Sequence, residues 1–215
     1  MLRAVLWDLD GTILDTTELI LSSYRHAFAK ILRREISDDS ALANFGEPLA
    51  NVMSKYSIER AEELMQCYRE HNHKHHDKQI RPFAGIHDAL ANLARRGYRQ
   101  AVVTSKTEWL SLQGLKLFGL DGFFEEVVGF ESTSEHKPSS APALEALKRL
   151  GFAPEQSVFV GDSLADCLCA KSAKIPFLFA EWGPNPCALG DERADFYLKD
   201  PRDILHVLPE KGAIF

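Results

Sequence analysis

Four aspartates follow two short apolar runs of this chain, Asp8 and Asp10 after the first and Asp162 and Asp166 after a later one. Crowded carboxylates repel one another and raise one another's pKa values unless a positive charge intervenes. One basic residue, Lys137, stands in a Gly/Ser/Pro-rich stretch between the two pairs. A hard divalent cation would balance the remaining negative charge, and Mg²⁺, which takes one or two carboxylates together with a substrate phosphate, suits this set best. The residue types therefore indicate chemistry on a phosphate compound.

The elements that must position these residues follow from the apolar pattern. Runs that are apolar on both faces are typical of buried parallel strands. Helix-length amphipathic segments lie between them, for example residues 85–96 and 139–150. This alternation predicts a doubly wound α/β fold, in which ligands bind outside the carboxyl ends of the strands. The predicted strands are residues 4–7, 101–103, 127–130, 158–160 and 176–180.

One stretch interrupts the alternation. Residues 16–80 contain no strand-like run but two helical patterns, one from Leu19 to Ile31 and one from Ile58 to Asp77. We therefore expect a helical domain at 16–80, inserted into an α/β core formed by residues 1–15 and 81–215. The connections at 15–16 and 80–81 are the expected hinges.

Composition and charge limit the possible partners. The 215 residues are 45% apolar and 26% charged, with a net charge of -6. An acidic chain without a dense Lys/Arg tract lacks the positive surface that nucleic-acid binding requires. No apolar run approaches the roughly 18 residues of a membrane span, and the N-terminal run is shorter than a signal-peptide core. We expect a cytoplasmic monomer or homodimer that acts on a small molecule, without nucleic-acid or membrane partners.

The motifs resemble those of a known family. The haloacid dehalogenase (HAD) superfamily has four motifs, which this chain matches in order and spacing with Asp8-Leu9-Asp10-Gly11-Thr12, Thr104-Ser105, Lys137-Pro138 and Gly161-Asp162-Ser163-Leu164-Ala165-Asp166. The helical insert resembles the small cap of subfamily I, in its phosphoglycolate phosphatase and PpaX-type pyrophosphatase branch. The resemblance spans essentially the whole chain. It implies a Rossmann-like core with an all-helical cap and the activity of a Mg²⁺-dependent phosphoric monoester hydrolase.

The resemblance assigns the chemical steps to the first motif. Asp8 would be the nucleophile that becomes an aspartyl phosphate. Asp10 would protonate the leaving oxygen and then activate water. Dehalogenases that displace halide need no acid at this place, so Asp10 favours phosphoryl transfer.

The resemblance also assigns the metal ligands. Asp8, the Asp10 carbonyl and Asp162 would hold Mg²⁺. Asp166 would stand behind them and orient waters or Lys137.

The remaining motif residues are assigned to the phosphate. Gly11, Thr104 and Ser105 would bind it, and Lys137 would neutralise its developing charge. Ser105 stands where many relatives carry Asn, and residues 137–142 lack two prolines of the usual Lys-Pro-x-Pro-x-Pro. Neither departure removes a catalytic group, so both concern loop geometry rather than the reaction.

Several functions remain open at this point. A phosphomonoester such as phosphoglycolate is the first expected substrate. Inorganic pyrophosphate, or a sugar phosphate in a mutase reaction, is an alternative within the enzyme class. A catalytically silent, metal-binding interaction module is the alternative outside it, although no catalytic position is missing.

Four further features carry weaker expectations. His71 and His75, four residues apart on a predicted helix, could ligate a transition metal, although a solvated helix face is more common. Segments 45–49 and 68–77 resemble substrate-side parts of the cap. Residues 182–184 are interpreted as the turn after the last core strand, without chemistry. The four cysteines, which should be reduced, are Cys67, Cys167, Cys169 and Cys187. Cys167 and Cys169 should pack as small apolar residues.

Overall fold

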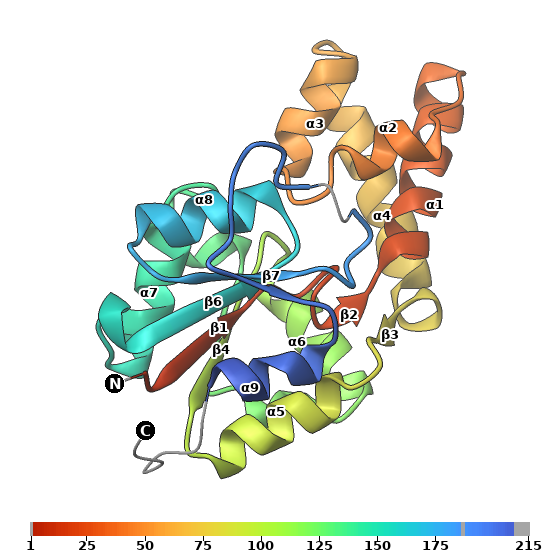
Figure 1. Ribbon diagram of the computed structural model, residues 1–215. Helices are drawn as coiled ribbons and strands as arrows, with labels where there is room; N and C mark the ends of the chain where they lie inside the picture. Colours follow the sequence, from red (N-terminus) through yellow and green to blue (C-terminus); the bar gives the residue numbers. More distant parts are fainter. Residues whose placement is uncertain (1, 186–187, 209–215) are drawn as a thin grey trace.

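The centre of the molecule is a parallel sheet with helices on both faces (Figure 1). The computed structural model describes residues 2–185 and 188–208. Within them the strand order is β5-β4-β1-β6-β7-β8, and every neighbouring pair is parallel. This confirms the predicted doubly wound α/β class. The strands are β1 (Ala4–Trp7), β4 (Arg99–Val103), β5 (Glu126–Val128), β6 (Ser157–Gly161), β7 (Phe177–Ala180) and β8 (Phe196–Leu198).

Strand β1 shows why the sheet is covered on both sides. All four of its side chains are buried. Val5 and Trp7 pack into one apolar cluster, and Ala4 and Leu6 pack into another on the opposite face. A strand that is apolar on both faces is stable only between two helical layers. The helices are α5 (Ile86–Arg95), α6 (Glu108–Leu117) and α9 (Ile204–Val207) on the first face, and α7 (Ala141–Leu150) and α8 (Leu164–Ser172) on the second.

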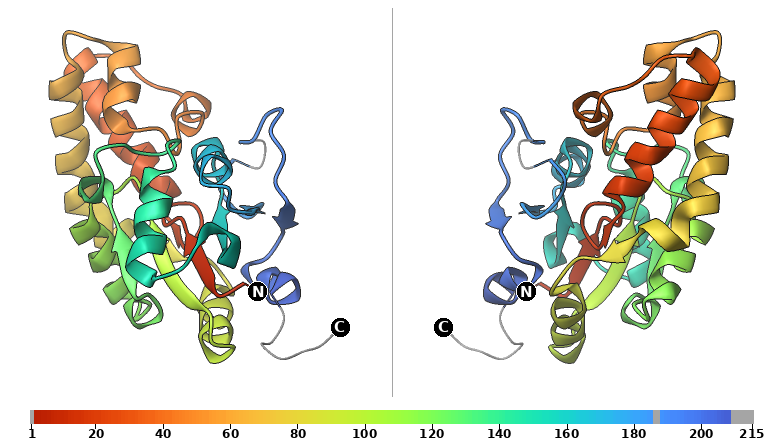
Figure 2. Two further views of the ribbon diagram at one scale, coloured as in Figure 1. Left: turned by 90° about the vertical axis from the view of Figure 1, so that its left-hand side faces the viewer. Right: turned by 90° about the vertical axis from the view of Figure 1, so that its right-hand side faces the viewer.

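The predicted insert forms a helical cap beyond the carboxyl ends of the central strands (Figures 1 and 2). It has an apolar cluster of its own, which includes Tyr24, Phe28, Met53 and Leu64. The cap therefore has an apolar core of its own, although Leu19 of the cap is buried in the first cluster of the α/β core. Its helices are α1 (Thr17–Ala27), continued by a π-helical turn (Phe28–Leu32), α2 (Asp38–Leu42), α3 (Leu49–Tyr56) and α4 (Ala61–Gln79).

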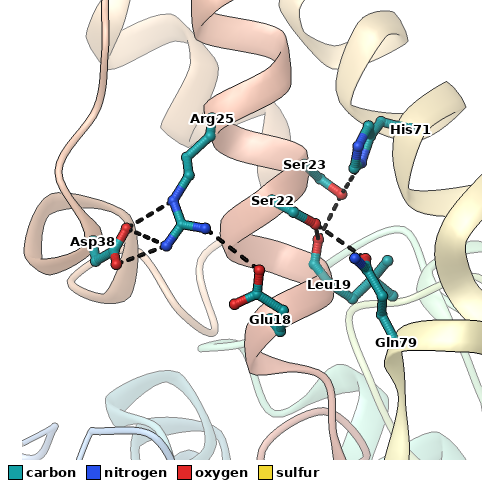
Figure 3. A network of polar contacts seen from close by, with 8 residues as sticks. All are labelled: Glu18, Leu19, Ser22, Ser23, Arg25, Asp38, His71 and Gln79. Atoms are coloured by element: carbon teal, nitrogen blue, oxygen red, sulfur yellow. Dashed lines mark hydrogen bonds and ion pairs between the residues drawn. The ribbon is translucent and has the colours of Figure 1, made fainter.

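Polar contacts join the two long cap helices (Figure 3). Ser23 Oγ on α1 donates to the Leu19 carbonyl at 2.6 Å and lies 3.2 Å from Nδ1 of His71 on α4. Ser22 Oγ lies 3.1 Å from Oε1 of Gln79, the last residue of α4. These contacts fix the register of α1 against α4.

The two connections between cap and core run side by side. Strands β2 (Leu14–Asp15) and β3 (Arg81–Pro82) form an antiparallel pair in which Asp15 faces Arg81. The hinges expected at 15–16 and 80–81 thus lie next to a small two-stranded sheet. Any cap rotation would turn both connections together.

Two strand predictions need correction. The run 176–180 is not the last core strand, because β8 follows it at the sheet edge with Phe196 and Tyr197 about half exposed. Because two of its three residues are exposed, β8 does not have the sequence pattern of a strand buried on both faces. The strand expected at 127–130 ends at Val128, because the chain turns into a 3-10 helix at Phe130. Residues 182–184 therefore connect β7 to β8.

The cysteine prediction holds where it is observed. Cys67, Cys167 and Cys169 are free and buried, and the last two pack into the apolar cluster under α8. Cys187 lies outside the described residues. Across residues 2–185 and 188–208, no helix combines the length and the apolar character needed to cross a bilayer.

The cap helix α4 packs closely on the core helix α6. Asp77 Oδ1 accepts a hydrogen bond of 2.7 Å from Gln113 Nε2. A side chain on Gly114 would begin 3.0 Å from Leu14 Cδ1 and 3.4 Å from His76 Cε1. The absence of a side chain at 114 therefore gives Leu14 and His76 room against α6.

We expect Gly114→Val to lower the free energy of unfolding by about 1–3 kcal/mol, because the added carbons overpack this contact. Thermal melting would show a decrease in Tm of about 2–10 °C. Gly122→Val is the matched control, because a side chain there meets nothing within 4 Å. Equal melting temperatures for the two variants would contradict the close packing of α4 on α6.

Candidate active site

The sequence-predicted site residues converge between the core and the cap. A cavity of about 730 Å³ opens there. Gly11 and Asp166 are buried directly behind its wall, and a side chain at Gly11 would collide with the Asp162 carboxylate. The structure thus brings all eight predicted residues together. Those that line the cavity are Asp8, Asp10, Thr104, Ser105, Lys137 and Asp162.

Lys137 forms the centre of the site. Its ammonium donates to Asp8 Oδ1 at 2.6 Å, to Asp166 Oδ1 at 2.5 Å and to the Val103 carbonyl at 3.0 Å. The side chain is only 4% exposed. All three ammonium hydrogens are therefore used, and Lys137 joins the ends of β1 and β4 to the start of α8.

Burial and mutual repulsion shift the pKa values of this cluster. Burial, with a smaller contribution from the Asp166 charge, raises the pKa of Asp8 from 3.8 to about 7. Burial and the nearby Asp8 raise the pKa of Asp162 well above its ordinary value. Burial alone would lower the pKa of Lys137, but the carboxylates of Asp166 and Asp8 raise it, so the lysine stays charged. The carboxyl groups outnumber the one ammonium that faces them.

Two free carboxylate oxygens fit a cation. The ligand atoms of Asp8, Asp162 and Asp166 lie within 4.8 Å of one another. Among the described residues, Oδ2 of Asp8 and Oδ2 of Asp162 accept no hydrogen bond. A donor set of carboxylate oxygens with raised pKa values suits a hard cation such as Mg²⁺, which would replace the protons.

Asp166 is already occupied. Its Oδ1 accepts from Lys137, and its Oδ2 accepts from the Ser163 N–H at 3.1 Å and from Ser163 Oγ at 2.5 Å. Ser163 Oγ accepts in turn from the Asp166 N–H, which makes a capping box at the start of α8. Asp166 is thus suited to hold Lys137 rather than to bind a metal directly. The Ser-x-x-Asp spacing is itself a sequence signal for this cap.

Residues that sequence reasoning missed hold the loop after β1. Thr12 Oγ1 donates to Asp162 Oδ1 at 2.8 Å, and Trp182 Nε1 donates to the Thr12 carbonyl at 2.9 Å. Gly183 lies against Asp162, where a Cβ would overlap it. The turn after β7, which was expected to carry no chemistry, therefore supports the acidic cluster.

The loop after β4 offers hydrogen-bond donors to the cavity. Thr104 Oγ1 accepts from the Lys106 N–H at 3.1 Å, which leaves its own hydrogen free to donate. Ser105 Oγ is buried and has no partner within the described residues. An unpaired buried hydroxyl is unfavourable unless a ligand completes it. Both hydroxyls are therefore placed to bind an oxyanion.

Asp10 has a partner that the motif did not indicate. Lys106 Nζ donates to Asp10 Oδ1 at 2.7 Å, with the lysine side chain 10% exposed. Lys106 directly follows Thr104-Ser105 in the chain, and this position is the signal that could have identified it. The Asp10 carboxylate stays apart from the group of three close carboxylates.

The cap supplies the outer wall of the cavity. Residues 45–49, noted above as a possible substrate-side loop, all line it. A Cβ on Gly46 would lie 2.7 Å from Ser163 Cβ, so this loop touches the core beside the acidic cluster. From α4, Tyr68, Arg69, Asn72 and His73 face the cavity.

The histidine run divides among three surroundings. His73 lines the cavity and packs edge-on against Trp109 with ring centroids 4.8 Å apart. His76 is buried against α6. His71 stacks between His26 and His75, with centroid distances of 4.7 and 4.4 Å. The histidines at 71 and 75 therefore lie away from the acidic cluster.

Comparison with known proteins identifies the family. The profile of the haloacid dehalogenase-like hydrolases matches residues 5–180. The chain belongs to this family. The pyrophosphatase PpaX of Halalkalibacterium halodurans is 37% identical over 174 residues, which are 81% of this chain and 81% of that protein. The pyrophosphatase PpaX of Bacillus velezensis is 32% identical over 205 residues, 95% of each chain.

Solved structures show the same HAD fold. One is described as a predicted phosphoglycolate phosphatase of Haemophilus somnus. It superposes with a TM-score of 0.84 and 25% identity, covering 96% of this chain and 97% of that one. The likeness spans both the α/β core and the cap.

We expect Mg²⁺ to stabilise this HAD-like hydrolase more at high pH than at low pH. The folded protein without metal holds more protons than the unfolded chain between the pKa values of 3.8 and about 7 for Asp8. Its stability therefore falls as pH rises through about 7. Mg²⁺ at about ten times the dissociation constant that it has at pH 8 should raise Tm by about 3–6 °C near pH 8. The same Mg²⁺ concentration should raise Tm by much less near pH 5.5.

Two variants test this assignment. Asp162→Asn should remove most of the Mg²⁺ effect on thermal melting, because it removes one ligand and one repelling charge. Asp39→Asn, an exposed carboxylate on α2, is the matched control and should keep the effect. A pH-independent response, or an unchanged response in Asp162→Asn, would contradict the site.

Proposed function

We propose that this HAD-family phosphatase hydrolyses a small phosphate compound through an aspartyl phosphate on Asp8, with Mg²⁺ as its cofactor. The observation that carries the proposal is the buried cluster of Asp8, Asp162, Asp166 and Lys137 at the base of the cavity. Asp8 and Asp162 would hold the metal, together with the Asp10 carbonyl. When bound, Mg²⁺ stabilises charge on the phosphoryl oxygens.

The chain's own residues account for the two steps. Asp8 attacks phosphorus, and the bond to the leaving oxygen breaks as that oxygen takes a proton from Asp10. A water molecule then gives its proton to Asp10 and attacks the aspartyl phosphate, which releases inorganic phosphate and restores Asp8. Thr104 and Ser105 hold the transferred group as fixed donors, and the Lys137 charge beside Asp8 offsets the negative charge that develops on its oxygens.

Pyrophosphate is the first candidate substrate. The relatives that are 37% and 32% identical over most of the chain are both named as pyrophosphatases. Phosphoglycolate, the first expectation from the sequence, is the second candidate. A mutase would keep the phosphoryl group bound between steps, so steady release of free phosphate would exclude it.

We expect Asp8→Asn to lower the rate of phosphate release by more than about a thousandfold, because the amide is not a nucleophile. A panel of pyrophosphate, phosphoglycolate, hexose phosphates and nucleotides, with and without Mg²⁺, measures both the reaction and its substrate. Circular dichroism and thermal melting should show that the variant remains folded. Retained turnover would refute the nucleophile, and no turnover by the wild-type protein would favour an interaction module.

We expect Asp10→Asn to separate the two steps. With an alkyl phosphate, the first step needs a proton donor and should slow by about a hundredfold or more. With 4-nitrophenyl phosphate the leaving group needs no proton, so a burst of one nitrophenolate per enzyme should precede slow turnover. Rapid-mixing absorbance measures the burst. A variant that slows the first turnover of both substrates equally would contradict the role of Asp10 as the acid.

A further inference from the structure

Lys106 is a positively charged residue that lines the cavity next to the catalytic cluster. Its Nζ lies 2.7 Å from Asp10 Oδ1 and faces the cavity. Its backbone is held on both sides, because its N–H donates to Thr104 Oγ1 at 3.1 Å and its carbonyl accepts from the Phe130 N–H at 2.9 Å. The ammonium therefore has a defined position next to Asp10.

Asp10 marks the place of the leaving group. In the proposed reaction Asp10 gives its proton to the oxygen that departs from phosphorus. Lys106 holds Oδ1 of this carboxyl, whereas Oδ2 accepts no hydrogen bond within the described residues. One oxygen is thus free for the leaving oxygen, and the ammonium that holds the other lies beside the rest of the leaving group.

Two glutamates that line the cavity together with Lys106 have hydrogen-bond partners of their own. Glu47 is bound by Lys55 at 2.7 and 2.5 Å, and Glu131 accepts from the Glu108 N–H at 3.0 Å. Arg69, which lines the cavity from α4, makes no ion pair in the part of the chain that the structure describes. Lys106 and Arg69 are therefore the cations that a second anionic group on the substrate would meet among the described cavity residues, because Lys137 is held by Asp8 and Asp166.

We propose that Lys106 binds an anionic leaving group, a phosphate or a carboxylate attached close to the scissile bond. The inference rests on the proposed phosphatase reaction and deepens it, because it names the class of substrate: small phosphates with a second negative charge on the leaving side. Arg69 lines the same cavity from the cap helix α4 and adds to the same attraction. Alkyl phosphates whose leaving group is uncharged lack this contact.

Two matched substrate pairs test the proposal. Phosphoglycolate is compared with 2-hydroxyethyl phosphate, in which a neutral CH₂OH replaces the carboxylate. Pyrophosphate is compared with methyl phosphate. For each substrate, kcat/KM of Lys106→Met is divided by that of the wild-type protein, so that intrinsic reactivity cancels.

We expect Lys106→Met to lower kcat/KM for the anionic member of a pair by about 10- to 100-fold more than for the neutral member, which is the usual effect of losing a charge-assisted hydrogen bond. The pair with the larger difference identifies the anion as phosphate or carboxylate. Lys106→Arg should recover most of the difference, because it keeps the charge. Lys116→Met, on an exposed part of α6, is the control for removing a lysine and should match the wild-type protein.

The outcomes separate this inference from the reaction itself. If Lys106 only orients Asp10, both members of each pair lose the same factor, which overturns the inference and leaves the phosphatase reaction intact. If the wild-type protein releases phosphate from none of the four substrates, the proposed function fails first. Thermal melting of each variant confirms that the compared proteins are folded.

Discussion

The contact between the buried Lys137 ammonium and two aspartates is the constraint on which the rest of the site depends. A charge that is removed from water must be fully hydrogen-bonded, and Lys137 satisfies this with Asp8, Asp166 and the Val103 carbonyl. These groups come from β1, β4 and the start of α8. The contact therefore requires that the ends of β1 and β4 and the start of α8, which are far apart in the chain, lie at the same edge of the sheet.

The same contact makes the site reactive. One ammonium does not neutralise the carboxyl groups packed around it, so burial and repulsion raise the pKa values of Asp8 and Asp162. A protein that keeps such groups ionised near neutral pH needs a further positive charge. Under the proposed function, the carboxylate oxygens without a hydrogen bond would hold the cation, and the Ser105 hydroxyl, which has no partner among the described residues, would donate to the phosphate. The pKa shifts of the site and the cation affinity proposed for it are thus two aspects of one imbalance of charge.

The cap forms the outer wall of the cavity that contains this charge. It touches the core beside the cluster at Gly46 and along α6 through Asp77 and His73. These contacts enclose a cavity large enough for the phosphoryl group and a small leaving group. Because β2 and β3 pair the two connections, the cap is attached to the core at one narrow place. The enclosing contacts, rather than the connections, hold the cap against the core.

The amino-acid sequence by itself determined the fold class, the helical nature of the insert and the motif residues. These properties depend on local spacing: runs apolar on both faces form buried strands, and polar residues that follow them lie at one sheet edge. The edge strand β8 was missed because two of its three residues are exposed. Only the tertiary structure decided that Lys106 contacts Asp10, 96 residues away, and that Asp166 is occupied by Ser163 and Lys137. Such contacts depend on which strands are neighbours, and strand order is settled by packing over the whole sheet, which local spacing does not encode.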